Sequence, residues 1–308
     1  MTAQRSTSQP THVAYADETN YNVGRYRGVA LVTLRLEDAA ASAADLRKLL
    51  DHSGVAEFEW KQLDDAKRRF AALKMLEYTV GKAMQRLLRV DVLTWDTEDS
   101  RHKIRGRDDI ANLQLMYYKV FKNVLRQRWP DGSVWRLCPD EHTAMDWDRM
   151  EDFLGMASTR LEARQDLFTG GQFRLRLKQE FSIQEIVPSK SLEQPLVQLA
   201  DLFAGLAVYS RPSYGRYEHW ESISSRQLEL FEQERGEPFR LSLSDHERCQ
   251  VLGRFVAQCK SRKLGVSLKT ERGLKTFDPR NAINFWWYQP QNEEDKAPLR
   301  SAQRPLPS

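Results

Sequence analysis

The chain has 308 residues, of which 41% are hydrophobic and 29% are charged. This composition is typical of a globular protein and excludes a fibrous or wholly disordered chain. The net charge of +4 permits a polyanionic partner without requiring one. The three cysteines, Cys138, Cys249 and Cys259, lack metal-ligand spacing and argue against a disulfide framework and a zinc finger.

The N-terminal residues and the most apolar run favour a cytoplasmic protein without a membrane partner. Residues 1–11 contain no apolar segment of the kind found in secretory signals. The run at residues 195–209 is too short to cross a membrane, and it contains Asp201. We therefore expect a cytoplasmic location.

Hydrophobic periodicity predicts strands and helices that alternate along most of the chain. The predicted strands are residues 13–17, 26–36, 56–60, 90–95, 134–138, 172–178 and 181–187. The predicted helices are residues 45–50, 64–88, 110–129, 147–161 and 195–209. A strand hairpin followed by alternating elements favours an α/β fold, with a mixed sheet covered by helices on its faces.

The character of the chain changes after residue 210. Residues 211–265 are polar and mostly helical, and Ser244 and Glu247 resemble a capping box for a helix that ends near residue 265. We interpret residues 12–210 as the core and residues 211–265 as a helical insertion or subdomain. Residues 266–289 are expected to pack back onto the core, and residues 1–11 and 290–308 to be disordered tails.

Four carboxylates stand at the ends of predicted strands or alternate along one. Asp17 closes the first strand, and Asp140 directly follows the fifth. Glu57 and Glu59 are two residues apart on the third strand, so both can point to one face. Each also has an ordinary explanation, since Asp17 can begin a turn, Asp140 can cap one, and the glutamates can face solvent on an edge strand.

Asp201 is different because it lies inside an apolar helix, where an unpaired charge costs on the order of several kcal/mol. Gln198 and Gly205 share its face, being three residues before it and four after it. Gly205 has no side chain and allows another segment to approach closely. A polar stripe of this kind suits a metal site at a sheet edge. A hydrogen bond to a neighbouring loop, or an arginine partner, explains it equally well.

Carboxylates that converge repel one another unless a cation lies between them. Oxygen-only ligation favours Mg²⁺ or Mn²⁺ over zinc, and the six histidines form no paired ligand motif. A two-metal carboxylate site suits in-line hydrolysis of a phosphodiester, because one ion activates water and the other stabilises the leaving oxygen. Such chemistry needs no side-chain nucleophile.

Three motifs resemble those of the domain-of-unknown-function family numbered 3800. Tyr15-Ala-Asp-Glu-Thr is similar to its YxDES opening, and Glu57-Phe-Glu-Trp-Lys-Gln-Leu is similar to its EFKW-type strand. Val197-Gln-Leu-Ala-Asp-Leu-Phe-Ala-Gly205 is similar to its closing QLADLxAG helix and is the most specific of the three. The resemblance covers residues 12–209, and residues 273–288 also look similar to extensions of some members.

The resemblance implies an RNase H-like fold, which is a mixed five-stranded sheet with acidic residues from the first strand, a middle strand and a late helix. On this pattern Asp17, Glu57 and Asp201 are metal ligands, and Asp140 takes the remaining acidic position. Glu59 stands where the family has a lysine, so either Glu57 or Glu59 is the ligand, and the departure leaves the activity of the site open. Candidates for groups that surround the ligands are Glu18, Glu141 and Gln198.

Two basic segments are candidates for contacts with nucleic acid. The first is a loop with Arg101, Lys103 and Arg105, and the second is one face of strand 172–178 with Arg174, Arg176 and Lys178. The ordinary explanation for both is a solvated surface. The aromatic run at residues 285–288 could stack on bases. Packing of the C-terminal segment onto the core explains that run better.

The sequence thus predicts a metal-dependent phosphodiester hydrolase, a nuclease for DNA or RNA with Mg²⁺ or Mn²⁺ as cofactor. The alternative is a non-catalytic RNase H-like module that binds nucleic acid or a protein partner in a larger system. Glu59 and residues 211–265 favour that alternative. A third interpretation, hydrolysis of a smaller phosphate ester, requires a closed pocket instead of an open basic groove. Convergence of the acidic residues supports either enzyme.

Overall fold

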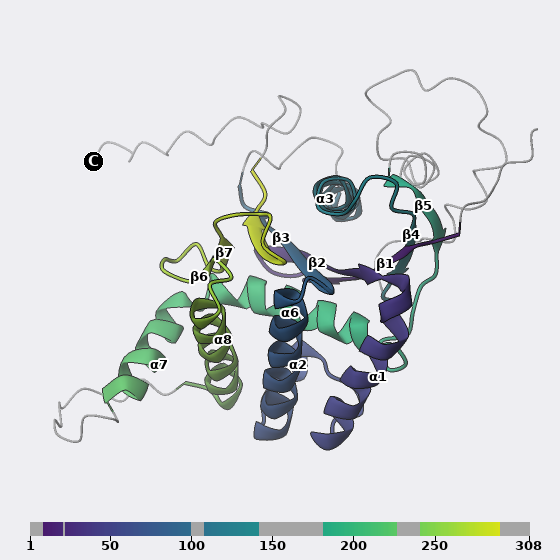
Figure 1. The fold of residues 1–308 in the computed structure, drawn as a ribbon. Coiled ribbons are helices and arrows are strands. Elements are labelled where there is room, and N and C mark those ends of the chain that lie inside the picture. The colour runs from purple at the N-terminus through teal and green to yellow at the C-terminus, as the bar shows by residue number, and fades with distance from the viewer. Residues whose placement is uncertain (1–8, 21, 100–107, 142–180, 227–240, 290–308) are drawn as a thin grey trace, which may run out of the picture.

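The computed structural model describes residues 9–20, 22–99, 108–141, 181–226 and 241–289, and it confirms the α/β class (Figure 1). A mixed six-stranded sheet has the strand order β5-β4-β1-β2-β3-β8. Its strands are β1 (His12–Thr19), β2 (Tyr26–Arg35), β3 (Leu88–Asp96), β4 (Trp135–Pro139), β5 (Ile183–Ile186) and β8 (Ile283–Trp287). Only β2 runs against the other five, because β1 and β3 pair with it in antiparallel fashion and the remaining pairs are parallel.

Helices cover both faces of this sheet (Figure 1). One face carries α1 (Leu36–His52), α2 (Ala66–Met84), α6 (Pro195–Ser210) and α8 (Leu243–Ser261). The other face carries α3 (Asp109–Val124). A further helix, α7 (Tyr214–Arg226), packs against α8, and a short pair of strands, β6 (Val266–Ser267) and β7 (Lys275–Thr276), leads to β8.

Alternate side chains of the central strands enter two separate cores. On β1, Val13 and Tyr15 pack in the core that contains α6, whereas Ala14 and Ala16 pack in the core beneath α3. Successive residues of a strand point to opposite faces of the sheet. Asp17 therefore belongs to the face of α6, as its position after Val13 and Tyr15 predicts.

The helix α6 is the buried element that the apolar run predicts. Every residue from Pro195 to Ser210 is buried except Asp201. The one carboxylate of the helix is thus its one residue with appreciable exposure. None of the helices in the described ranges is long and apolar enough to span a bilayer.

The prediction of five strands is wrong, because β8 adds a sixth. This strand pairs with β3 in parallel register, and Val90 lies opposite Ile283. Phe285 enters the core on the α6 face, while Trp286 packs against the core on the α3 face. The aromatic run therefore packs on the core, and it does so as part of the strand β8. The sequence favours this packing over stacking on bases.

The predicted strand at residues 56–60 is also wrong. These residues lie in an irregular stretch that leads into a short 3-10 helix, η1 (Trp60–Gln62). The alternation behind the prediction is real, since Phe58 and Trp60 are buried. Their backbone amides, however, donate to side chains of α6 instead of to a neighbouring strand. Side-chain oxygens of α6 here accept the hydrogen bonds that a neighbouring strand would accept in a sheet.

Two other elements differ from the prediction, and two further predicted elements lie outside the described residues. The helix predicted at residues 45–50 begins much earlier, at Leu36, because the alanine-rich stretch after β2 is a strong helix former. The N-cap of α8 is Ser242, not Ser244, and its hydroxyl oxygen accepts a hydrogen bond from the Asp245 amide at 3.0 Å. The predicted helix 147–161 and strand 172–178 lie outside the described residues.

Candidate functional site

A cavity of about 620 Å³ opens at the edge of the sheet where β1 and β4 end. The five acidic residues singled out in the sequence all line it. They are Asp17, Glu57, Glu59, Asp140 and Asp201. The structure thus brings together carboxylates from a strand end, a loop after a second strand, an irregular segment and a helix.

Strand register places Asp17 and Asp140 side by side. The strands β1 and β4 are parallel neighbours, and Ala16 lies opposite Pro139. The next residues along the two strands, Asp17 and Asp140, therefore lie side by side, with Asp17 still within β1 and Asp140 directly after β4. The Asp140 amide continues the pairing by donating to the Ala16 carbonyl oxygen at 2.9 Å. Two carboxylates at neighbouring strand ends follow directly from this pairing.

One face of α6 holds the segment that carries the two glutamates. The side-chain oxygen of Gln198 accepts a hydrogen bond from the Phe58 amide at 2.8 Å, and a carboxylate oxygen of Asp201 accepts one from the Trp60 amide at 2.6 Å. One turn further, the Trp60 ring lies so close to Gly205 that a Cβ there would be 2.1 Å from the ring carbon Cγ. We call residues 57–62 the acidic segment.

This arrangement explains the spacing of Gln198, Asp201 and Gly205 in the sequence. Both amide atoms of Gln198 bond backbone groups, since its nitrogen donates to the Ser191 carbonyl oxygen at 2.6 Å. These hydrogen bonds of Gln198 go to the main chain and fix the backbone on which Glu57 and Glu59 stand. Its role around the metal ligands stays a prediction.

The two glutamates have different partners. Glu57 accepts a hydrogen bond from the hydroxyl group of Ser191. Glu59 forms an ion pair with Lys61 at 2.7 Å and accepts a hydrogen bond from the Gln62 side-chain amide at 2.6 Å. Glu59 therefore has a cationic partner, and Glu57 has a neutral one.

The protein around Asp17 and Asp201 disfavours the charged forms of these two carboxylates. Burial raises the pKa of Asp17 well above its ordinary value, and repulsion from Asp201 and Asp140 adds to the effect. Burial also raises the pKa of Asp201 to about 7, against the opposing hydrogen bond from the Trp60 amide. Glu59 and Asp140 contribute further repulsion at Asp201. The cavity is thus a place where positive charge is favoured.

The chemistry of the donors fits Mg²⁺ or Mn²⁺, because carboxylate oxygens are the ligands that these hard cations prefer. Within the described ranges, no three His, Cys, Asp or Glu side chains already stand in an arrangement that would enclose a metal ion.

Sequence reasoning missed several residues of the cavity. Lys61 lines it and supplies a positive charge two residues after Glu59. Asn20 and Asn22, from the turn between β1 and β2, also line it. Asparagines in a tight turn ordinarily serve the turn itself, so their position carried no functional signal. Ser191 could not be found at all, because only the fold brings it to Glu57.

The remaining predicted residues fall into two groups. Glu18 lines the cavity and accepts a hydrogen bond from the Tyr117 hydroxyl. Glu141 follows Asp140, and its amide donates to the Ser189 carbonyl oxygen at 3.0 Å. The predicted nucleic-acid contacts lie outside the described residues; they are Arg101, Lys103, Arg105, Arg174, Arg176 and Lys178.

Fold and cavity together define an α/β protein with an acidic cavity at one edge of a mixed sheet. Two proteins of Methanothermobacter thermautotrophicus, ORF2' and ORF2, are similar to the chain over 294 residues, at 38% and 36% identity. Both are described as uncharacterized, and each match covers 93% of this chain and 97% of the relative. The chain belongs to the same protein family as ORF2' and ORF2. No protein-family model matches it.

Proposed function

We propose that this protein is a metal-dependent phosphodiester hydrolase of the RNase H-like type, acting on nucleic acid. The observation that carries the proposal is the convergence of Asp17, Asp140 and Asp201 on one cavity, where burial and mutual repulsion raise the pKa of Asp17 and Asp201. Buried carboxylates that repel one another are stabilised by a divalent cation.

The architecture supports the same proposal. The resemblance to the family numbered 3800 implies a mixed sheet with acids from the first strand and a late helix. Asp17 lies near the end of β1, and Asp201 lies on α6. The acid that the resemblance places on a middle strand comes here from the acidic segment, which α6 holds through Gln198 and Asp201.

In this proposal Asp17, Asp140 and Asp201 would hold Mg²⁺ or Mn²⁺, together with Glu57 or Glu59. The bound cation supplies acidity to a coordinated water molecule and neutralises charge on the phosphate. Gln198 and Gly205 position the acidic segment. Lys61 offers a cation to a substrate phosphate at the same cavity.

A cleavage assay tests the proposal. Single- and double-stranded DNA and RNA are incubated with the protein in Mg²⁺, in Mn²⁺ and in EDTA. We expect cleavage of one of these substrates with metal and none with EDTA. Absence of cleavage from every substrate, with retained binding to nucleic acid, would instead identify a non-catalytic module.

The stability of the metal-free protein is expected to fall as the pH rises. The folded-state pKa of Asp201, about 7, is higher than its ordinary value of 3.8, so the folded protein binds more protons than the unfolded chain between these values. The free energy of unfolding therefore decreases from about pH 4 to about pH 7. Asp17 acts in the same direction.

Added Mg²⁺ should raise the midpoint of thermal unfolding at about pH 8 by several degrees and have little effect at about pH 5, where protons compete for the carboxylates. Differential scanning calorimetry in EDTA and in Mg²⁺ at both pH values measures this. An Asp201→Asn variant with the same pH dependence of stability as the wild type would contradict the assignment.

Glu57 and Glu59 are expected to differ as metal ligands. Lys61 partly neutralises Glu59, whereas the hydroxyl partner of Glu57 leaves its charge in place. Glu57→Gln should therefore weaken Mg²⁺ binding on the order of tenfold, and Glu59→Gln by less. Isothermal titration with Mg²⁺ measures both variants. A larger loss in Glu59→Gln would assign the ligand to Glu59.

A further inference from the structure

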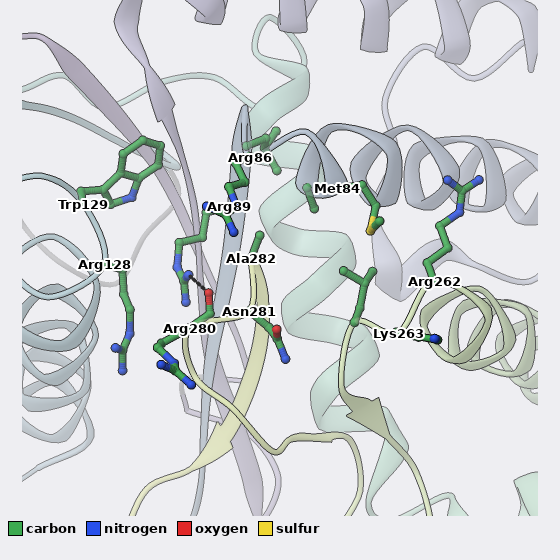
Figure 2. A pocket seen from close by; sticks show the side chains of 13 residues that line it. Met84, Arg86, Arg89, Arg128, Trp129, Arg262, Lys263, Arg280, Asn281 and Ala282 are labelled. Atoms are coloured by element: carbon green, nitrogen blue, oxygen red, sulfur yellow. Dashed lines mark hydrogen bonds between the residues drawn. The ribbon is translucent and has the colours of Figure 1, made fainter.

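A second cavity lies toward the opposite end of the sheet and has the opposite electrostatic character (Figure 2). Its volume is about 560 Å³. Six basic residues line it, namely Arg86, Arg89, Arg128, Arg262, Lys263 and Arg280. Among the described residues no acidic side chain lines it. We call it the basic pocket.

Strand register separates the basic pocket from the acidic cavity. Arg89 lies opposite Thr33 on β2, whereas Asp17 lies opposite Ala30 on the same strand. The two positions are thus about 10 Å apart along the strand direction. Moreover, the pocket is bounded by the ends of α2 and α8, while the acids gather at the ends of β1 and β4. The two sites are therefore separate.

Much of the positive charge in the basic pocket is not neutralised. Arg89 is paired with the buried Asp91 at 2.6 Å, and Arg280 with Asp278 at 2.8 Å. The other four cations have no ion-pair or hydrogen-bond partner for their side chains in the part of the chain that the structure describes; they are Arg86, Arg128, Arg262 and Lys263. Four cationic side chains around one cavity thus form no ion pair among the described residues.

The guanidinium groups also repel one another. Figure 2 shows Arg89, Arg128 and Arg280 gathered on one side of the pocket. Burial lowers the pKa of Arg128, repulsion from Arg89 lowers it further, and the charges of Asp91 and Asp278 partly offset this lowering. An anion between these groups would relieve that repulsion. Trp129 lies beside them and gives the pocket an aromatic wall.

Two of the free cations occupy backbone positions that favour glycine. Arg86 and Lys263 follow the ends of α2 and α8 and have φ angles of 59° and 55°. Both helices end in the same motif, in which the next amide donates to a carbonyl five residues back, from Leu87 to Lys82 and from Leu264 to Cys259. Glycine is the usual residue at this position. Here the chain carries a cation at both helix ends.

We propose that the basic pocket binds phosphate groups, presented by a small polyphosphate ligand or by a nucleic-acid strand. Unpaired arginine and lysine side chains around a concave site are the groups that recognise phosphate oxygens. A volume of this size accommodates a small phosphorylated ligand. The proposal is independent of hydrolysis at the acidic cavity.

The test uses a variant that removes charge without straining the fold. Arg86→Gly combined with Lys263→Gly deletes two of the free cations and places the favoured residue at both helix ends, so urea unfolding should show equal or greater stability. Pyrophosphate and a short oligothymidylate serve as probes in isothermal titration at low salt. We expect affinity for pyrophosphate to fall on the order of tenfold in the variant.

A charge-matched control separates the pocket from general surface charge. Lys48 and Arg254 are exposed on α1 and α8 and do not line the pocket. Lys48→Gln combined with Arg254→Gln should leave pyrophosphate affinity unchanged. Arg128→Gln provides a second pocket variant if the glycine variant fails to fold. Asp201→Asn should retain full binding, since it changes only the acidic cavity.

The outcomes separate the two sources of phosphate. Loss of affinity for both probes in the glycine variant would indicate that a nucleic-acid strand reaches the pocket. Loss for pyrophosphate alone would indicate a small phosphorylated ligand. Failure of the wild type to bind pyrophosphate, or equal losses in the pocket and control variants, would overturn the proposal.

Discussion

Asp201→Asn should abolish metal-dependent cleavage while making the metal-free protein more stable at about pH 8. The asparagine keeps an oxygen that can accept the hydrogen bond from the Trp60 amide, so the acidic segment stays in place. The charge that repels Asp17 and Asp140 disappears. We expect the cleavage rate to fall on the order of a thousandfold, which corresponds to ~4 kcal/mol of transition-state stabilisation.

A variant that loses activity and gains stability identifies a residue whose charge is needed for function and destabilises the fold. Thermal unfolding in EDTA and cleavage in Mg²⁺ measure the two effects on the same preparation. Asp45→Asn is the matched control, because Asp45 is half-exposed beside Lys82 on the surface. It should change neither quantity appreciably. Unaltered cleavage by Asp201→Asn would remove Asp201 from the site.

Gly205→Ala should be the most destabilising of the conservative changes on α6. The added methyl group would lie 2.1 Å from Cγ of the Trp60 ring, which is far inside van der Waals contact. Relief requires the ring to move, and the acidic segment moves with it. We expect a loss of about 3 kcal/mol in the free energy of unfolding, at the upper end of the usual cost of overpacking, together with loss of cleavage.

A double-mutant cycle in urea separates this clash from a general effect on the helix. In a Trp60→Leu background the same Gly205→Ala change should cost much less, because the ring is absent. Gly81→Ala on α2 is the matched control, since no atom lies within 4 Å of its added methyl group. It should stabilise by about 0.5–1 kcal/mol. Equal costs of Gly205→Ala in the two backgrounds would contradict the contact.

The sequence predicts best those strands and helices in which hydrophobic residues recur at a regular spacing over many residues. The strands β1, β2 and β3 and the helices α2 and α6 appear close to their predicted limits, because hydrophobic spacing distinguishes strand from helix over such lengths. The short strand β8 reads in the sequence as an aromatic cluster. In this strand Ile283 and Phe285 face one core and Trp286 faces the other. This alternation is typical of a strand, but the strand has only five residues, which is too few for a clear pattern.

The acidic segment illustrates the limit of pattern reasoning. Its period of two is shared with a strand, and both glutamates do line one cavity. Nothing local to residues 56–60 reveals that the amides of Phe58 and Trp60 bond α6, which lies about 140 residues later. Conversely, the spacing of Gln198, Asp201 and Gly205 does indicate that another segment packs on that face of α6. Only the fold shows that this segment is the acidic segment.

Sheet completion by β8 has a consequence for synthesis of the chain. Until residues 283–287 leave the ribosome, β3 is an open sheet edge, and its unpaired backbone groups can recruit other chains. Asp91 on β3 also lacks Asn284 during that interval, although the two side chains bond at 3.0 Å across 193 positions in the finished fold. The sheet edge at β3 is therefore completed only at a late stage of synthesis.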